Sequence, residues 1–564
     1  MTIVIRVMQR ARDVVRGFAS DTRGNIAMIS AFVIPVLLLI TFGGIDIHRA
    51  STVKANLQDS LDAATLAAAR SPYTTDADIT RVGLASLQAN LAPYKDISLQ
   101  TAGTTFKLDN TGAVVGDARV NVSALVANII LPMVGQGTGD TIPVKAHSEV
   151  LRSNNRVEVA LVLDNTGSMA GTKLSNLKAA ATDLIDRLEA ADSRSIEPDA
   201  IKISLVPFSQ TVRVVQGGSN TVPSYMSNAN THTGGGAVSS NPYSLFSTAV
   251  GRFTLFGRLG TTWGGCVEAR QAPYDIRDDA PVSSNQARMF VPYFAADEPD
   301  RDDYPNDSTW RNFDYEGNDY LLDGAQTGSN NYAGSNNAFA SSTARNTEWF
   351  RRVRNSAKYA TTYLKSGSLN TSRGPNRGCD LQPLIRLTDN YDQLRTAVNN
   401  MIASGNTNVP LGTMWGWHTL SPNAPFGDGR AYGTDRLTKI IIIMTDGENV
   451  MSQYDSPNGS NYNGMGYIWQ NRLGITSGSD SQRRTAMDNR FDHPNAGVED
   501  MCGNMKGDGI EVYTVAVQVD ASAQTLLRRC ASDDEHYFPV DSASGIGAAF
   551  DRIAGAIENL RISR

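Results

Sequence analysis

The most prominent hydrophobic feature of the chain is an uncharged run from Ile26 to Ile45. Five arginines precede it, namely Arg6, Arg10, Arg12, Arg16 and Arg23. The run is long enough to span a bilayer, and it exceeds the apolar region of about 7 to 15 residues found in a cleaved signal peptide. We therefore expect a retained transmembrane helix over residues 26–45. The arginines predict a cytoplasmic N-terminus, residues 1–25, with the rest of the chain outside the cytoplasm.

The next segment, residues 46–150, combines helical and strand-like patterns. One apolar face, formed by Leu57, Leu61, Ala64 and Ala68, predicts that the membrane helix continues outward. A second helix is expected over Ile79 to Leu91, and short β-type runs follow, of which Arg119 to Val126 and Thr141 to Val150 are the clearest. A long apolar helix that leads into a small sheet is the layout of a pilin-like subunit.

From residue 151 to residue 564 the pattern becomes α/β. Buried-strand runs alternate with amphipathic helices, and the strands are expected at Val157 to Leu163, Ile201 to Phe208, Leu437 to Met444 and Ile510 to Val517. The last helix has an apolar stripe of Ile546, Phe550, Ile553, Ile557 and Leu560. This alternation predicts a doubly wound, mostly parallel, Rossmann-like sheet, in which ligands bind at the carboxyl ends of the strands.

The alternation stops between about residues 211 and 385. This stretch is rich in Gly, Asn, Ser, Asp and Tyr, and we interpret it as an ordered insertion near the site because it also contains Trp263, Trp310 and Trp349. It includes an acidic segment, residues 297–303. We expect that segment to be a solvated loop, with Ca²⁺ binding as the less favoured alternative because it lacks the spacing of a calcium loop.

Oxygen-bearing residues follow two of the expected strands and precede one helix. Asp164, Thr166 and Ser168 alternate in a turn, Thr407 lies ahead of a helix, and Asp446 ends a strand. Such a set suits a hard cation, Mg²⁺ or Mn²⁺, with Ca²⁺ as an alternative. A plain turn is the other interpretation of the first segment. The set resembles the metal-ion-dependent adhesion site of the von Willebrand factor type A family, whose pattern is Asp-x-Ser-x-Ser, a Thr and an Asp; Thr166 replaces one Ser.

That resemblance implies the fold and the use of the site. In the family, an acidic side chain of a protein partner completes the coordination of the metal. We expect the same here, with Asn165 and Glu448 exposed beside the site and able to contribute to the choice of partner.

The N-terminal segment resembles a second family. Arg23-Gly24-Asn25-Ile26-Ala27, Pro35 within the apolar run, and Gly43-Gly44-Ile45-Asp46 are similar to the start of TadE/TadG-like Flp pilus assembly proteins. Ile29 stands where prepilins usually carry Glu, which argues against pilin-type processing. It matches the larger TadG-like members, which combine this anchor with a von Willebrand A domain in the inner membrane.

The four cysteines, Cys266, Cys379, Cys502 and Cys530, all lie on the expected outer side of the membrane. An oxidising compartment permits disulfides there, and three pairings are possible. We favour Cys266 with Cys379, which bracket one insertion, and Cys502 with Cys530, which flank one strand–helix unit. Free buried thiols are the alternative, and the long spacings argue against zinc.

Composition and motifs narrow the function. The chain has 564 residues, enough for two or three folded units, and its net charge of -6 gives no basic footprint for nucleic acid. Motifs for zinc proteases, serine hydrolases and phosphate loops are absent from the sequence, and an isolated His418 or His536 is more often structural than catalytic. We therefore expect a protein that is not an enzyme.

These patterns together predict a single-pass inner-membrane protein with a periplasmic C-terminal domain, acting in Flp pilus assembly by binding another pilus-assembly or envelope protein through its metal. The alternative is a metal-dependent periplasmic or surface adhesin or scaffold that is unrelated to pili.

Overall fold

The computed structural model describes residues 25–562 except 72, 74, 95–96, 110–111, 125–140, 152–154, 194, 196, 198, 228–243, 314–316 and 324–337. The predicted cytoplasmic segment therefore lies almost wholly outside the described residues. The chain divides into two compact units, residues 1–153 and residues 154–564.

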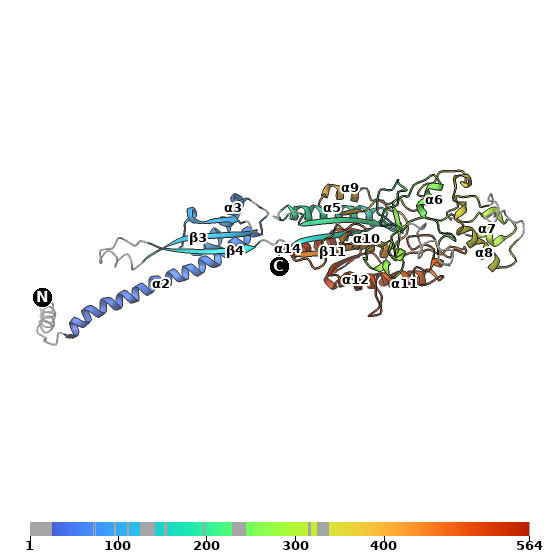
Figure 1. Cartoon of the computed structure of the whole chain (residues 1–564). Coiled ribbons are helices and arrows are strands. Elements are labelled where there is room, and N and C mark those ends of the chain that lie inside the picture. Colours follow the sequence, from blue (N-terminus) through green and yellow to red (C-terminus); the bar gives the residue numbers. More distant parts are fainter. Residues whose placement is uncertain are drawn as a thin grey trace. The chain divides into compact units, whose positions relative to one another are not determined.

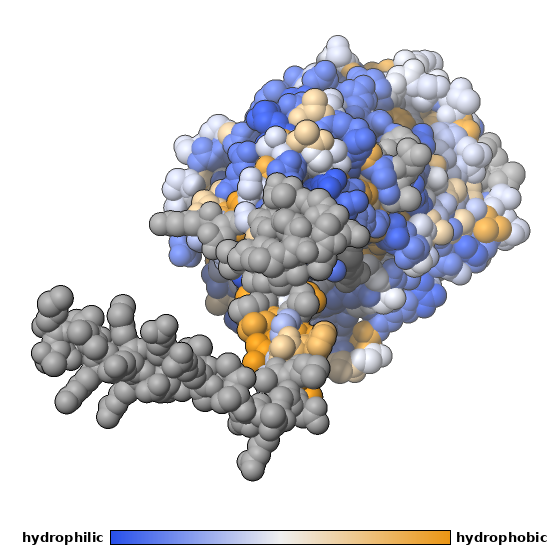
Figure 2. Space-filling view, turned by 90° about the vertical axis from the view of Figure 1, so that its left-hand side faces the viewer, coloured by the Kyte–Doolittle hydropathy of each residue, from blue (hydrophilic) through white to orange (hydrophobic). Residues whose placement is uncertain are grey.

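The first unit is built on one long helix, α2 (Asn25–Ala69), which contains Pro35. Its N-terminal part exposes apolar side chains, including Phe32, which is 74% exposed. The stretch from Ile29 is long and apolar enough to cross a membrane, with a mean hydropathy of 2.1. The start of α2 is accordingly hydrophobic in the space-filling view of Figure 2, whereas most of the other coloured surface is hydrophilic.

The second half of α2 packs on a small antiparallel sheet (Figure 1). The apolar stripe predicted from the sequence, Leu57, Leu61, Ala64 and Ala68, is fully buried. Strand β3 pairs with the other three strands of this sheet. The remaining elements are α3 (Asp76–Leu91), β1 (Ser98–Leu99), β2 (Thr105–Leu108), β3 (Ala113–Ser123) and β4 (Thr141–Leu151).

The second unit has a central parallel sheet of β5 (Arg156–Asp164), β6 (Ile201–Phe208), β11 (Leu437–Thr445), β12 (Ile510–Val517) and β13 (Tyr537–Val540). Strand β10 (Ile385–Thr388) pairs antiparallel with β6. Counted along the chain, β10, β6, β5, β11, β12 and β13 give the doubly wound order 3-2-1-4-5-6. The fold class predicted from the sequence is confirmed.

Helices cover both faces of this sheet, and residues of β5 alternate between the two cores. One face packs against α5 (Thr172–Asp192), α9 (Tyr391–Asn399) and α14 (Ile546–Ile562). The other packs against α10 (Val409–Leu420), α11 (Asp480–Phe491), α12 (Met501–Gly507) and α13 (Ala521–Cys530). Because both faces are buried, the strands appear in the sequence as continuous apolar runs.

The region between β6 and β10 is better integrated than we expected. Its short strands β7 (Val212–Arg213), β8 (Cys266–Glu268) and β9 (Val291–Pro292) extend the same sheet in antiparallel fashion. The three tryptophans of the region are buried in the core that this region shares with α10. Its helices are α6 (Arg252–Arg258), α7 (Ser308–Asn312) and α8 (Ser342–Val353).

The acidic segment 297–303 is not the solvated loop that we predicted. Asp297 is fully buried, and its Oδ2 lies 2.7 Å from Lys358 Nζ. Asp303 pairs with Arg352, and Asp300 with Lys365. These cations lie about 50 to 65 residues further along the chain than their partners, so the compensation was not visible in the local composition.

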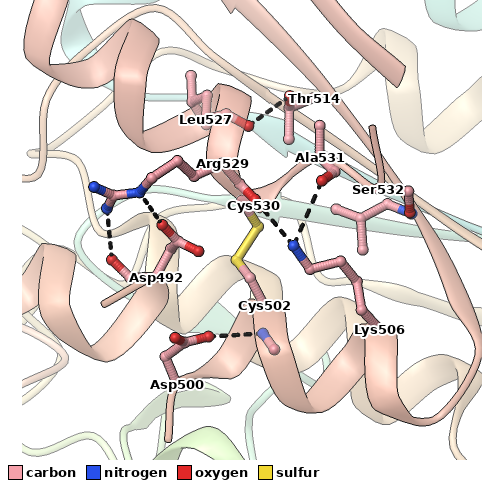
Figure 3. Close-up of a disulfide and its surroundings, with 12 residues drawn as sticks. Asp492, Asp500, Cys502, Lys506, Thr514, Leu527, Arg529, Cys530, Ala531 and Ser532 are labelled. Carbon is pink, nitrogen blue, oxygen red and sulfur yellow. Dashed lines mark hydrogen bonds and ion pairs between the residues drawn. A yellow bond between two sulfur atoms is a disulfide. The ribbon is translucent and has the colours of Figure 1, made fainter. Parts of the chain in front are cut away.

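The structure contains both favoured disulfides, Cys266–Cys379 and Cys502–Cys530. The second joins α12 to the end of α13, as Figure 3 shows. Nearby, Lys506 Nζ donates to the carbonyl of Arg529 at 2.9 Å, and Asp492 accepts from Arg529 Nε at 2.6 Å. The Lys506 contact reinforces the covalent link between α12 and α13, and the Asp492 contact ties the end of α11 to α13.

Candidate functional site

The predicted metal ligands lie in loops at the carboxyl ends of β5 and β11 and at the start of α10. Asp164 is the last residue of β5, and Asp446 follows the last residue of β11. The two strands are adjacent and parallel, with Leu163 opposite Met444. The chain leaves β5 toward β6 on one side and returns as β11 on the other, so this is the switch point at which doubly wound sheets bind ligands.

Hydrogen bonds link these residues directly. Ser168 Oγ donates to Asp446 Oδ1 at 2.6 Å, and Ser168 Oγ lies 2.9 Å from Thr166 Oγ1. The first oxygen of Asp164 accepts from the backbone N–H of Thr166 at 2.7 Å. Four of the five predicted residues therefore form one cluster, with Asp164 held against the turn that carries the two hydroxyls.

Thr407 borders the same small space. A Cβ atom on Gly447 would lie 3.4 Å from Thr407 Oγ1 and 3.8 Å from Ser168 Oγ. Glycine at position 447 therefore leaves both hydroxyls uncovered by a side chain. The structure brings all five predicted residues to one edge of the sheet.

Backbone contacts fix the three loops relative to one another. The carbonyl of Gly405 accepts from the N–H of Gly167 at 3.0 Å, and the carbonyl of Thr407 accepts from the N–H of Val450 at 2.9 Å. Asn408 caps α10 by accepting from the N–H of Leu411, which ends the loop that carries Thr407. The hydroxyl-bearing turn is thus bonded to the Thr407 loop, and the Thr407 loop to the segment after β11.

Asn165 differs from expectation. It is fully buried, and its Nδ2 donates to the carbonyl of Ile402 at 3.0 Å. It therefore supports the Thr407 loop instead of facing a partner. Glu448 is partly exposed, as expected, and is paired with Arg484.

The site concentrates negative charge away from water. Burial raises the pKa of Asp164 to about 6, and the nearby charge of Asp446 acts in the same direction. Two carboxylates and three hydroxyls offer only oxygen ligands, the chemistry that hard divalent cations prefer. The donor set therefore fits Mg²⁺ or Mn²⁺, and such a cation would supply the positive charge that the two carboxylates require.

Two further residues of the site were not predicted from the sequence. Thr445 Oγ1 donates to the second oxygen of Asp164 at 2.6 Å, and Lys173 Nζ donates to Asp446 Oδ2 at 2.6 Å. A signal for Lys173 was present, because it lies in the first turn of α5, where the helix dipole disfavours a cation. Its position implied a nearby carboxylate.

A second acidic cluster lies in the region between β6 and β10. Asp300, Asp303 and Asp323 place one carboxylate oxygen each within 4.8 Å of the others, close enough to hold a metal ion. Basic side chains already contact all three, since Lys358 Nζ is 3.0 Å from Asp323 and the other two pair with Lys365 and Arg352. This cluster is therefore charge-compensated by the protein itself.

The two histidines considered as bases lie elsewhere. His418 is fully buried, with its ring 4.9 Å from that of Phe290, and burial lowers its pKa well below the usual range. His536 Nδ1 lies 2.6 Å from Asp533 Oδ1, after α13. Neither histidine contacts the oxygen cluster through a hydrogen bond among the described residues.

Three solved structures illustrate the similarities of the chain to known folds. The pilus adhesin SpaC from Lactobacillus rhamnosus GG is 11% identical over 82% of this chain and 34% of its own, with a TM-score of 0.28. The vWF domain of the type V pili tip protein Mfa5 from Porphyromonas gingivalis is 11% identical over 74% of this chain and 98% of its own, with a TM-score of 0.30. Proximal thread matrix protein 1 from the mussel byssus, with a zinc-occupied MIDAS motif, is 9% identical over 72% of this chain and 47% of its own, with a TM-score of 0.25.

This chain thus spans about a third of the length of SpaC. No curated protein matches it in sequence. A family model does match residues 24–71, and it is described as putative Flp pilus-assembly TadE/G-like. The matched residues include all of α2, with the exposed apolar part and the buried stripe. Over residues 24–71, therefore, the chain is similar to the TadE/G-like Flp pilus-assembly family.

Proposed function

We propose that this protein is a membrane-anchored, non-enzymatic component of Flp pilus assembly that binds a protein partner through a divalent cation. Asp164, Thr166, Ser168, Thr407 and Asp446 would hold the cation, Mg²⁺ or Mn²⁺. The observation that carries the proposal is the convergence of three loops, distant in sequence, on one oxygen-lined edge of a doubly wound sheet.

The charge of the donor set indicates the kind of partner. Three of the five ligands are neutral hydroxyls, and one of the two carboxylates, Asp164, already accepts two hydrogen bonds from the protein. A divalent cation in such a site, when bound, supplies an open position that attracts an external oxygen anion. We therefore propose that the partner presents an Asp or Glu side chain.

The anchor supports the pilus assignment. The apolar start of α2 and the match to the TadE/G-like family lie in the same residues. We propose a single transmembrane segment over residues 26–45 of an inner membrane, with residues 1–25 in the cytoplasm and residues 46–150 forming a pilin-like stalk. Residues 151–564 would then be the periplasmic binding domain, with residues 211–385 as its large insertion.

The experiment is affinity capture with the full-length protein in detergent, as wild type and as Asp164→Ala. Membrane extracts of the native cell would be passed over each form in Mg²⁺ and in EDTA, and retained proteins identified by mass spectrometry. The proposal predicts that pilus-assembly proteins are held only by wild type in Mg²⁺.

Three other outcomes would each contradict one part of the proposed function. Retention in all four conditions would contradict the role of the metal. If wild type in Mg²⁺ retains envelope proteins that do not belong to a pilus system, the adhesin or scaffold alternative is favoured. Turnover of a substrate that Asp164→Ala abolishes would contradict the non-enzymatic assignment.

A further inference from the structure

Lys173 reaches from the first turn of α5 into the oxygen cluster, where its Nζ lies 2.6 Å from Asp446 Oδ2. We propose that Lys173 is a built-in counter-ion: it occupies Asp446 when no divalent cation is bound, and it must leave for the cation to bind. This inference rests on the proposed metal site and assigns that site an internal competitor.

The position of Lys173 is otherwise unfavourable. It is the second residue of α5, and the first turn of this helix carries no acidic residue. A cation at a helix N-terminus faces the positive end of the helix dipole. The contact with Asp446 offsets this cost, so the lysine and the carboxylate depend on each other.

Both oxygens of Asp446 are engaged in this arrangement. Ser168 donates to Oδ1 and Lys173 to Oδ2, and the carboxylate side chain is 0% exposed. A divalent cation coordinated at this cluster would lie beside the ammonium group, and like charges at such distances in a partly buried site repel strongly. Cation and ammonium therefore compete for the same carboxylate.

The Lys173 ammonium group can leave Asp446 for solvent. Its side chain is 24% exposed, whereas that of Asp446 is not exposed at all. The flexible four-carbon stem lets the ammonium swing into water without moving the backbone of α5. Binding of the cation would then release a positive charge at the rim of the site, and this charge would attract the acidic side chain that we propose for the partner.

The test is a Mn²⁺ titration of the full-length protein in detergent, with free Mn²⁺ measured by its EPR signal. The variant Lys173→Met keeps the length and apolar stem of the side chain but removes the charge. Its matched control is Lys178→Met, which removes a charge from the same helix. Among the described residues, Lys178 Nζ donates only to the carbonyl of Asn399. We expect Lys173→Met to bind Mn²⁺ at least about tenfold more tightly than wild type, because the competing charge is gone. Lys178→Met should bind Mn²⁺ with the affinity of wild type.

Thermal unfolding gives a second readout. In EDTA, Lys173→Met is expected to unfold at a lower temperature than wild type, because two buried carboxylates then lack a counter-ion. In saturating Mn²⁺ that difference should vanish or reverse. An equal loss of stability in both conditions, with unchanged Mn²⁺ affinity, would show a purely structural ion pair and overturn the inference.

The outcomes separate this inference from the proposed function. If wild type and Lys173→Met bind Mn²⁺ equally, the counter-ion role fails and the metal site stands. If neither binds, the metal site itself fails. If only Lys173→Met binds, the counter-ion role is supported and the metal site of the native chain is contradicted. If Lys173→Met does not fold, Lys173→Arg replaces it as the test variant. Arginine keeps the charge and offers a bidentate contact to Asp446, so this variant should bind Mn²⁺ more weakly than wild type. Mn²⁺ binding as tight as that of wild type would overturn the inference.

Discussion

Ser168 and Asp446, 278 positions apart in the sequence, share a hydrogen bond of 2.6 Å. The bond exists because β5 and β11 are neighbours in the parallel sheet and end at the same edge. Each residue lies in the loop that follows its strand at this edge. The order of the strands therefore creates the site, and the loops supply its chemistry.

The first prediction concerns this hydroxyl. Ser168→Ala removes one proposed ligand and leaves Asp446 Oδ1 without its donor. We expect metal affinity to fall at least about tenfold, so that Mg²⁺ raises the melting temperature of the variant much less than that of wild type. Ser175→Ala is the control, because the Ser175 hydroxyl is exposed and, in the part of the chain that the structure describes, donates only to the carbonyl of Thr172 within α5. An undiminished Mg²⁺ effect in Ser168→Ala would remove Ser168 from the site.

The second prediction concerns the support of Asp164. Thr445→Val preserves the shape of a buried side chain but removes the donor to Asp164 Oδ2. A buried carboxylate oxygen without its partner should cost about 1 to 3 kcal/mol of unfolding free energy in EDTA. Urea denaturation measures this cost. Thr525→Val, at an exposed threonine that bonds the carbonyl of Ala521, should change stability little, and a Thr445→Val variant as stable as that control would contradict the account.

The third prediction concerns the disulfides. Cys266–Cys379 closes a separation of 113 residues, and Cys502–Cys530 one of 28. Replacing either pair by serine should lower the free energy of unfolding, because the unfolded chain gains freedom. The loss should be about 1 kcal/mol larger for the longer loop if loop entropy dominates. Urea denaturation of the two double variants without reductant measures both losses of unfolding free energy. A larger loss on removal of Cys502–Cys530, which closes the shorter loop, would show that native packing around that bond, and not loop entropy, determines its contribution.

The fourth prediction concerns pH. Burial raises the pKa of Asp303 to about 6, even though Arg352 opposes the shift. A carboxyl whose pKa is raised by folding contributes stability below its unfolded pKa, near 4, and loses that contribution as the pH rises through 6. Asp303→Asn mimics the protonated form at every pH, so it should gain stability relative to wild type between pH 4 and pH 7.

The expected gain is on the order of 1 to 2 kcal/mol, allowing for the partial exposure of the carboxyl. Unfolding in urea at pH 4 and pH 7 measures it for both proteins. Asp302→Asn, at an exposed neighbour, is the control. The difference in unfolding free energy between Asp303→Asn and wild type should increase as the pH rises. A difference that stays constant or decreases would show that burying the charged Asp303 carboxylate does not destabilise the fold.

Much of the fold was predictable because the central strands are buried on both faces. Their apolar runs, such as Ile201 to Phe208, coincide with the observed strands. The short strands β7 to β9 were not predicted, because two or three residues are too few to show an alternating pattern. Strand β13 was missed for the same reason, since it has four residues.

The candidate site was predictable in its oxygen ligands and not in its contacts. Chain order and residue type indicated Asp164, Thr407 and Asp446. The position of Lys173 in the first turn of α5 indicates a nearby carboxylate, but it does not identify that carboxylate as Asp446. Asn165 was expected to be exposed, and it is buried because the carbonyl of Ile402 accepts its amide. In each case, the information lies in a partner far away in the sequence.

Anomalous diffraction from crystals of the protein grown with Mn²⁺ would test the proposed metal site most directly. We predict a single strong anomalous peak within ligand distance of Ser168 Oγ, Thr407 Oγ1 and the carboxylates of Asp164 and Asp446, with the Lys173 ammonium moved away from Asp446. Crystals with Mn²⁺ in large excess that show no peak at this cluster, and Lys173 still bonded to Asp446, would contradict it.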